Sequence, residues 1–309
     1  MSKYSLRKVG EGKVRNIYEV VGSITPLLMF VVTDRVSVND RVVGEIPGRG
    51  RLLNLISAYW KNMITCCQII ETDSSNENIL KELRNCDGFS IVKKAILIPC
   101  EIIVRRYLTG SIYKSYLENN RKEGVYLGIN LPAGLEEWDR LSKAVITPTT
   151  KAPSGEKDKP ILFKDVVLAI EEVMKENSDF FGKVHRTPES YAREIFGASL
   201  DIFGFANKML KQKNILLVDT KFEFGFIQNE SNGIILALID EVLTPDSSRF
   251  IQKKEYEQLE RKIIHLSKQT LRDWIVENPN LPIPDSVKKK VLEEYTNIYK
   301  KLVNTPYFF

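Results

Sequence analysis

Two apolar segments joined by a short polar turn dominate the last third of the sequence. Residues 215–227 and 233–243 are both rich in Ile, Leu, Val and Phe, a composition typical of β-strands. The segment between them, Asn229-Glu230-Ser231-Asn232-Gly233, is typical of a hairpin turn. We therefore expect an antiparallel hairpin here, and its charged residues are the first candidates for chemistry.

The first strand of this hairpin carries three charged residues at alternate positions. Side chains on a strand alternate between its two faces, so Asp219, Lys221 and Glu223 share one face and apolar residues share the other. A solvent-exposed strand face has the same pattern. The strand alone therefore leaves both interpretations open.

The return strand adds carboxylates to the picture. It is apolar until Asp240 and Glu241, and a turn centred near residue 231 places Glu223 opposite Ile239 or Asp240. Two carboxylates that face each other in an apolar hairpin repel, so we expect a cation between them. Mg²⁺ typically takes one or two carboxylates together with substrate phosphates. The hypothesis is that Glu223 and Asp240 hold Mg²⁺.

A glycine-rich segment, Val9-Gly10-Glu11-Gly12-Lys13-Val14-Arg15, precedes a predicted strand near the start of the chain. It does not match the Walker pattern, which needs Ser or Thr after the lysine and then a helix. Two glycines beside a lysine can still bring backbone amides close to phosphates, as the Gly-rich loop of kinases does. A plain hairpin turn explains the segment equally well.

Basic residues next to hydroxyl groups occur twice more. The predicted strand 101–107 contains two arginines, and the Gly-Ser pair at 110–111 then opens a helix whose N-terminus can bind an anion. Residues 244–249 combine a carboxylate, two serine hydroxyls and Arg249, which can hold a phosphate or carboxylate through paired hydrogen bonds. A solvent-exposed strand end and an Asx or Ser/Thr turn are the alternatives.

Apolar periodicity and turn residues predict the remaining elements. We predict further strands at 15–21, 27–33 and 90–98, the last ending at Pro99. We predict helices at 52–67, 111–120, 163–176, 188–213, 251–275 and 285–303, and a long loop at 128–160.

The residue counts exclude several classes of protein. The four cysteines form no CxxC pair and there are only two histidines, which argues against a zinc site and a disulfide framework. No apolar run approaches the roughly 18 residues of a membrane span, and the first residues do not resemble a signal peptide. The net charge of +5 is spread along the chain, which favours small anionic substrates over nucleic acid. We expect a cytoplasmic protein without membrane or nucleic-acid partners.

Taken in order, several segments resemble those of the phosphoribosylaminoimidazole-succinocarboxamide synthase, or SAICAR synthetase, family of purine biosynthesis. The matching segments are GKVRNIYEV, TDRVSVND, IPGRGRLLNLIS, PCEIIVRRYLTGS, LPAGLEEWDRL, ITPTTKA, VDTKFEFG and LIDEVLTPDSSRF. They run from about residue 10 to residue 250, and the predicted C-terminal helices fit the longer members of the family.

The resemblance implies an α+β fold with two lobes and a kinase- or ATP-grasp-like nucleotide cleft between them. It implies a β-rich lobe at 1–100, a central catalytic lobe at 101–250 and a helical segment at 251–309. The implied reaction is ATP-dependent: the carboxylate of carboxyaminoimidazole ribonucleotide is phosphorylated, and the amine of L-aspartate then displaces phosphate. ATP and Mg²⁺ are the implied cofactors, the partners are these small molecules, and an oligomer is compatible with the resemblance.

Carried over position by position, the resemblance also implies roles for individual residues. The catalytic residues are Lys221 and Asp219, and the metal ligands are Glu223 and Asp240. The ATP-binding residues are Gly10, Gly12, Lys13, Arg15, Glu101 and Lys221. The substrate-binding residues are Asp40, Arg105, Ser111, Lys151, Asp246, Ser248 and Arg249.

The chain departs from the family pattern at three places. Asn39 stands where an aromatic residue usually precedes the aspartate, Lys157 replaces a histidine, and Ile251 replaces a tryptophan. The residues implied for ATP and Mg²⁺ are intact, so these changes bear on recognition of the acceptor. The stretch after Asp40 is also about one residue short.

Three hypotheses follow. The first is a SAICAR synthetase, the second a divergent amide ligase that joins another carboxylate and amine, and the third a non-catalytic nucleotide-binding homologue. The intact Lys221, Glu223 and Asp240 argue against the third. A protein kinase is disfavoured because no HRD-type loop precedes the hairpin.

Overall fold

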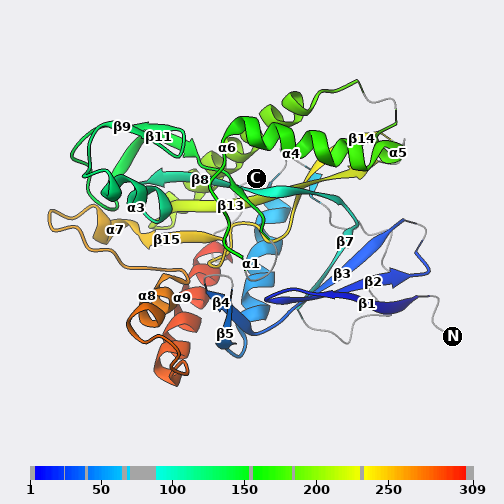
Figure 1. Cartoon of the computed structure of the whole chain (residues 1–309). Coiled ribbons are helices and arrows are strands. Elements are labelled where there is room, and N and C mark those ends of the chain that lie inside the picture. The colour runs from blue at the N-terminus through cyan, green and yellow to red at the C-terminus, as the bar shows by residue number, and fades with distance from the viewer. Residues whose placement is uncertain are drawn as a thin grey trace.

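The computed structural model describes residues 4–23, 25–38, 41–64, 68–69, 88–152, 156–182, 185–229 and 233–303. Within these ranges the strands form a four-stranded sheet, a seven-stranded sheet and two small two-stranded sheets (Figure 1). The four-stranded sheet has the order β1-β2-β3-β7: Ser5–Glu11, Arg15–Val21, Leu27–Val32 and Phe89–Lys93. The small sheets pair β4 (Arg35–Val38) with β5 (Arg41–Glu45) and β9 (Gly124–Tyr126) with β10 (Ile129–Leu131).

The seven-stranded sheet is built around β13 (Ile215–Gln228), which pairs antiparallel with β8, β14 and β15. The other strands are β8 (Ile96–Tyr107), β11 (Arg140–Ile146), β12 (Thr149–Thr150), β14 (Ile234–Ile239), β15 (Ser248–Gln252) and β6 (Gln68–Ile69). Because β13 has partners on both edges, its backbone is satisfied within the sheet. The predicted hairpin is confirmed as β13–β14.

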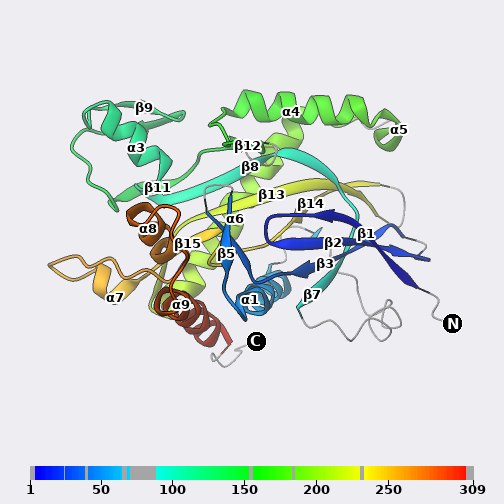
Figure 2. The ribbon, with the colours of Figure 1, turned by 60° about the horizontal axis from the view of Figure 1, so that its bottom comes forward.

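Two long helices cover one face of this sheet. α4 (Phe163–Glu176) and α6 (Pro188–Gln212) lie on that side of β8 and β13, and the four-stranded sheet lies on the other (Figure 2). Phe222, Phe224 and Phe226 of β13 are in the main hydrophobic core, where Phe226 makes an edge-to-face contact with Tyr191 of α6 at 4.9 Å. This packing turns the other face of β13 away from the helices.

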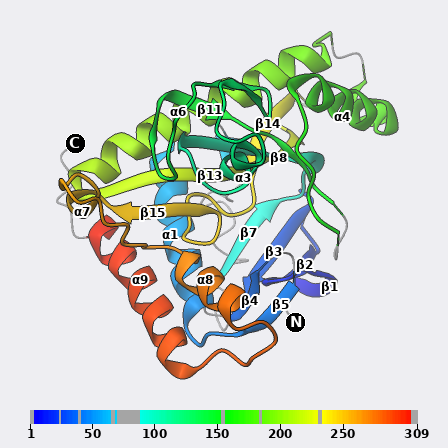
Figure 3. The ribbon, with the colours of Figure 1, turned by 60° about the vertical axis from the view of Figure 1, so that its left-hand side comes forward.

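A second core joins the N- and C-terminal regions. α1 (Arg49–Met63) packs along α9 (Asp285–Val303), and α8 (Gln269–Glu277) lies beside them (Figure 3). The carboxylate of Asp34 accepts the backbone N–H groups of Gly48 and Gly50, which satisfies the start of α1. Short helices complete the fold: α3 (Ser111–Glu118), α5 (Ser178–Phe181) and α7 (Lys253–Tyr256).

Three predictions of secondary structure are wrong. The predicted 90–98 strand divides after Lys93, and β8 continues through Pro99, which lies in a bulge opposite β13 where no ladder N–H is needed. The predicted loop 128–160 contains β10, β11 and β12. The predicted helix 251–275 begins instead as β15 and resumes as α8, because Phe250 and Ile251 pair with β13 and this pairing overrides local helix propensity.

The predicted division into three segments stays a prediction. Strand β8 runs across its first boundary, and α9 from the last segment packs on α1 from the first. The α+β composition agrees with the expectation. Among the helices in the described part of the chain, none is long and apolar enough to cross a lipid bilayer.

Candidate active site

The charged face of β13 is buried inside the protein. Asp219 is 4% exposed and Glu223 is 5% exposed, and their side chains point away from the phenylalanine face. The interpretation of this face as a solvated surface is therefore wrong. Glu223 lies opposite Ile239 of β14, one of the two registers expected, and opposite Glu101 of β8 on its other side.

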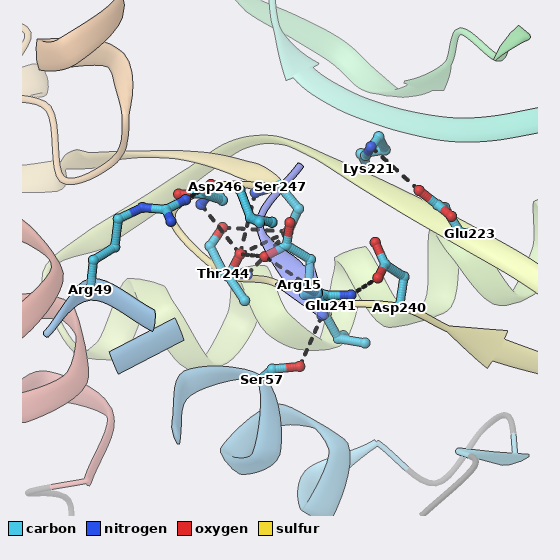
Figure 4. A network of polar contacts seen from close by, with 12 residues as sticks. Arg15, Arg49, Ser57, Lys221, Glu223, Asp240, Glu241, Thr244, Asp246 and Ser247 are labelled. Carbon is cyan, nitrogen blue, oxygen red and sulfur yellow. Dashed lines mark hydrogen bonds and ion pairs between the residues drawn. The ribbon is translucent and has the colours of Figure 1, made fainter. Parts of the chain in front are cut away.

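Lys221 is held between two buried carboxylates. Its Nζ lies 2.5 Å from Oε1 of Glu101. It also lies 3.4 Å from Oε1 of Glu223 (Figure 4). Burial opposes the charged form of Lys221, but the two carboxylates more than offset it and raise the pKa of the ammonium. Burial raises the pKa of Glu101, and Lys221 counteracts that shift. Lys221 is therefore a fixed positive charge.

Lys151 joins this group from the segment after β12. Its ammonium forms an ion pair with Glu223, and the pKa of Glu223 is lowered by Lys221 and Lys151 against the effect of burial. Lys151 is itself partly exposed. The structure thus brings the predicted residues Glu101, Lys151, Lys221 and Glu223 together.

Asp240 lies at the end of the hairpin and contacts the four-stranded sheet. It follows β14 with a φ of 65° and forms an ion pair with Arg15 of β2 (Figure 4). Nη2 of Arg15 also lies 3.8 Å from Oε2 of Glu241. A small pocket lined by Arg15, Ser57 of α1, Asp240 and Glu241 opens beside this contact.

Cationic side chains of the protein neutralise the carboxylates of Glu223 and Asp240, which were expected to repel each other. Each carboxylate has an ion-pair partner, Lys151 for Glu223 and Arg15 for Asp240. Within the described ranges, no three His, Cys, Asp or Glu side chains are close enough to form a metal cage. Mg²⁺ commonly needs only one or two carboxylates beside phosphate oxygens, so the donor set present fits that ion.

A second group of charged side chains is centred on Asp219, two residues before Lys221 on β13. Arg105 of β8, Asp219 of β13 and Arg249 of β15 sit side by side across the sheet. Oδ2 of Asp219 accepts hydrogen bonds from Nη1 of Arg105 at 2.9 Å and from Nη1 of Arg249 at 2.5 Å. Arg105 also donates to Oγ of Ser111 at 3.0 Å and to Oγ1 of Thr147 at 2.8 Å. Asp219 therefore aligns two guanidinium groups next to the start of α3.

Asp246 is the centre of a buried cluster that sequence analysis missed. Its carboxylate pairs with Arg49 of α1, and accepts hydrogen bonds from Lys268 at 3.0 Å and from the Tyr295 hydroxyl at 2.6 Å. Burial opposes ionisation of Asp246, but Arg49 and Lys268 more than compensate and lower its pKa. These partners all belong to the protein itself, and direct binding of substrate by Asp246 stays a prediction. Arg49 belongs to the segment IPGRGRLLNLIS that resembles the family, but the sequence did not indicate that it is buried and pairs with Asp246.

Ser248 also faces away from the site. Its Oγ lies 2.8 Å from Oγ1 of Thr220 on the opposite face of β13, where both are buried. Ile251 is fully buried beside Tyr107 and Val218, so the departure at this position lies in the core.

The glycine segment forms the turn between β1 and β2. The N–H of Gly12 donates to the carbonyl of Arg15 at 2.7 Å, and a methyl group added at Gly10 or Gly12 would meet only ordinary contacts. Arg35, to which sequence analysis gave no role, donates to the carbonyl of Gly12 at 3.0 Å and pairs with Glu11. Arg35 therefore holds this turn near Arg15.

Two predicted features have no described contact with these groups. Asp40 and the departure at Asn39 lie outside the described residues. Lys157 is exposed, while its neighbour Asp158 accepts the N–H of Ala152 at 2.7 Å and so organises the segment that carries Lys151.

The chain matches the family model of SAICAR synthetase over residues 8–283. It belongs to the SAICAR synthetase family. The phosphoribosylaminoimidazole-succinocarboxamide synthase of Syntrophobacter fumaroxidans is 37% identical over 306 residues, which covers 93% of this chain and 91% of the relative. The corresponding protein of Schizosaccharomyces pombe is 33% identical, covering 96% and 93%.

Solved structures agree with this assignment. The SAICAR synthase of Saccharomyces cerevisiae in complex with SAICAR superposes with a TM-score of 0.76 at 29% identity, covering 98% of this chain and 97% of that one. A type-2 SAICAR synthetase in complex with ADP has a TM-score of 0.61 at 20% identity, which supports the fold alone. The expected family, its α+β fold and an ATP-dependent ligase of purine biosynthesis are confirmed at the level of the family.

Proposed function

We propose that this SAICAR synthetase family member ligates L-aspartate to carboxyaminoimidazole ribonucleotide, with ATP as the phosphoryl donor. The observation that carries the proposal is the pair of charged groups on one face of β13. Lys221 lies between Glu101 and Glu223, and Asp219 lies between Arg105 and Arg249. Two residues of strand separate the groups, a rise of about 7 Å. One strand thus presents a phosphoryl-transfer position beside an anion-binding position.

The first half of the reaction transfers a phosphoryl group. A carboxylate oxygen of the ribonucleotide attacks the γ-phosphorus of ATP, the bond to the leaving oxygen breaks, and ADP departs. Lys221 supplies a fixed charge where negative charge develops, and Arg15 faces the same region from β2. In this proposal Gly10, Gly12 and Lys13 cover the ATP phosphates.

Mg²⁺ fits next to these residues. When bound, it would neutralise charge on the phosphate oxygens that it contacts. Glu223 and Asp240 are the proposed ligands, and Lys151 and Arg15, their present ion-pair partners, would then pair with phosphate oxygens.

The second half forms the amide. The amine nitrogen of L-aspartate attacks the acyl carbon, inorganic phosphate leaves, and the nitrogen loses a proton. Arg105, Ser111 and Arg249 hold the anionic ends of the substrates, and Asp219 keeps both guanidinium groups oriented. Neither Asp246 nor Ser248 is assigned direct contact in this proposal, since each is engaged internally.

The solved yeast relative supports the substrates, because that structure is of a complex with SAICAR itself. The absence of CxxC pairs supports a cytoplasmic location.

The test is a coupled measurement of two products. The purified chain is incubated with ATP, Mg²⁺, the ribonucleotide and L-aspartate, and both ADP and the succinocarboxamide are followed. Lys221→Ala is expected to lower both rates at least ~100-fold. Lys175→Ala, on the exposed side of α4, is the matched control and should leave both unchanged. Turnover that requires a different amine, or Lys221→Ala with wild-type ADP production, would overturn the proposal.

A further inference from the structure

Arg35, the first residue of β4, binds the turn between β1 and β2 at several points. Its Nη2 donates to the carbonyl of Gly12 at 3.0 Å and to Oδ1 of Asn16 at 3.1 Å. Its Nη1 pairs with the carboxylate of Glu11. Its Nε donates to Oγ1 of Thr33 at 3.2 Å, which fixes the plane of the guanidinium. The N–H donors of an arginine form a rigid planar fork, so these bonds together hold the turn in one position.

The bond from Arg35 to Gly12 also orients the backbone of the turn. A trans peptide group is planar, and its C=O and N–H point in opposite directions. Because Arg35 holds the carbonyl of Gly12, the N–H of Lys13 is fixed on the side of the turn away from Arg35. The N–H of Gly12 is used within the turn, where it donates to the carbonyl of Arg15 at 2.7 Å. Arg35 thus sets the direction of a backbone amide in the turn that is proposed to cover the ATP phosphates.

The backbone of Arg35 is fixed from the opposite side. Its carbonyl accepts a hydrogen bond from Nη1 of Arg49 at 2.5 Å, and Arg49 is fully buried and paired with Asp246. The next residue, Val36, is fully buried in the core that α1 forms with α8 and α9. β4 stands between α8 and the β1–β2 hairpin (Figure 3). Arg35 therefore anchors the turn to the C-terminal helices as well as to its own sheet.

The position of this turn affects two parts of the proposed ATP site. The turn leads directly into Arg15, whose guanidinium pairs with Asp240, a proposed Mg²⁺ ligand. A displaced turn would move both the amides above the phosphates and the arginine beside the metal site. Groups that are already fixed before the ligand arrives lose less conformational entropy on binding. An anchored turn should therefore bind the nucleotide more tightly than a mobile one.

We infer that Arg35 is a positioning residue for ATP, which fixes the β1–β2 turn over the phosphates from an anchor in the C-terminal helical core. This inference rests on the proposed function for the identity of the nucleotide. It gives Arg35 no contact with substrate: the residue acts through the backbone of Gly12 and Lys13. It also makes nucleotide affinity depend on elements that are distant in sequence from the glycine segment.

The test measures nucleotide binding and steady-state kinetics in the full-length chain. Arg35→Ala is expected to weaken MgADP binding, followed by calorimetry, about 10-fold and to raise the KM for ATP by a similar factor, because charge-assisted hydrogen bonds to the turn are lost. The KM for L-aspartate, and kcat at saturating ATP, should stay within about 2-fold of the wild type, since the variant loses nucleotide binding and not the chemical step. Arg7→Ala, which removes an exposed ion pair with Glu19 on the same sheet, is the matched control.

Arg35→Lys tests whether the geometry of the guanidinium matters. Lysine keeps the charge but cannot reproduce the fork, so it should restore only part of the MgADP affinity, and it replaces Arg35→Ala if that variant fails to fold. Wild-type MgADP affinity in either folded variant contradicts the inference. So do equal rises in the KM values of all three substrates with a lower melting temperature, which indicate a purely structural role. A wild-type chain that binds MgADP but forms no succinocarboxamide overturns the proposed function alone, and MgADP binding then still tests Arg35.

Discussion

Nζ of Lys221 lies 2.5 Å from Oε1 of Glu101, across the neighbouring strands β13 and β8. The two residues are 120 positions apart in the chain; the side chain of Glu101 is buried and that of Lys221 is partly buried. A buried lysine needs such a partner to stay charged. In Glu101→Gln the amide oxygen can still accept a hydrogen bond, but Glu223, at 3.4 Å, is the one ion-pair partner left to Lys221 among the described residues. We expect the KM for ATP to rise and kcat to fall, each about 10-fold or more. Steady-state kinetics checks this, with exposed Glu118→Gln as control; equal losses in both variants would exclude a specific role.

Glu223→Gln tests the metal site. The amide retains the shape of the side chain but loses the charge that the proposed Mg²⁺ needs, so half-maximal activity should require at least ~10-fold more Mg²⁺. The KM for L-aspartate should be unchanged. A Mg²⁺ titration at saturating substrates measures the shift, and Glu171→Gln on the exposed side of α4 serves as the comparison. An unaltered Mg²⁺ requirement removes Glu223 from the ligand set.

Asp246→Asn should destabilise the protein. The change leaves Arg49 and Lys268 buried near each other without a counterion, which typically costs about 3–5 kcal/mol. Chemical denaturation followed by circular dichroism gives the free energy of unfolding. Asp285→Asn, whose side chain is 98% exposed, should change it by less than ~0.5 kcal/mol. A loss of activity in Asp246→Asn without a loss of stability would instead indicate direct contact with substrate.

Replacement of glycine by alanine should change the stability of the protein differently at three positions. At Gly50 the new carbon would lie 2.8 Å from the carbonyl oxygen of Thr33, so Gly50→Ala should cost about 1–3 kcal/mol. Gly197 of α6 has no atom within 4 Å of that position, and Gly197→Ala should stabilise by about 0.5–1 kcal/mol. Gly12→Ala should leave stability unchanged, so any rise in its KM for ATP reports the phosphate loop itself. Thermal unfolding and ATP kinetics measure both effects.

The buried carboxyl of Glu294 should make the stability of the protein depend on pH. Burial raises the pKa of its carboxyl to about 7, although Thr270 donates a 2.7 Å hydrogen bond to it and Lys290 opposes the shift. The folded state therefore binds a proton that the unfolded state releases near pH 4.5, and stability falls as pH rises between these values. Glu294→Gln should remove this loss and stabilise the protein at pH 8 by about 1–2 kcal/mol. Unfolding curves at pH 5 and pH 8 provide the check; an equal effect at both values would contradict it.

Much of the candidate site was predictable because it lies on one strand. Alternation placed Asp219, Lys221 and Glu223 on one face, and the hairpin turn put Glu223 opposite Ile239 or Asp240, of which the structure has Ile239. The same local rules failed for residues 251–275, where pairing of β15 with β13 replaces the predicted helix. The same rules also assigned Ser248 and Arg249 one shared role in binding substrate, although these adjacent residues point to opposite faces of β15.

The sequence by itself determined the hairpin, the charged face of β13 and the resemblance to SAICAR synthetase, because strand periodicity and ordered segments are local properties. Only the tertiary structure decided which charges meet. Asp246 pairs with Arg49 from 197 residues away. Gln269, at the start of α8 in the region predicted as one longer helix, accepts a hydrogen bond from Nε of Arg249 at 3.2 Å. The partner of a buried charge depends on how distant elements pack, and that information is spread over the whole core.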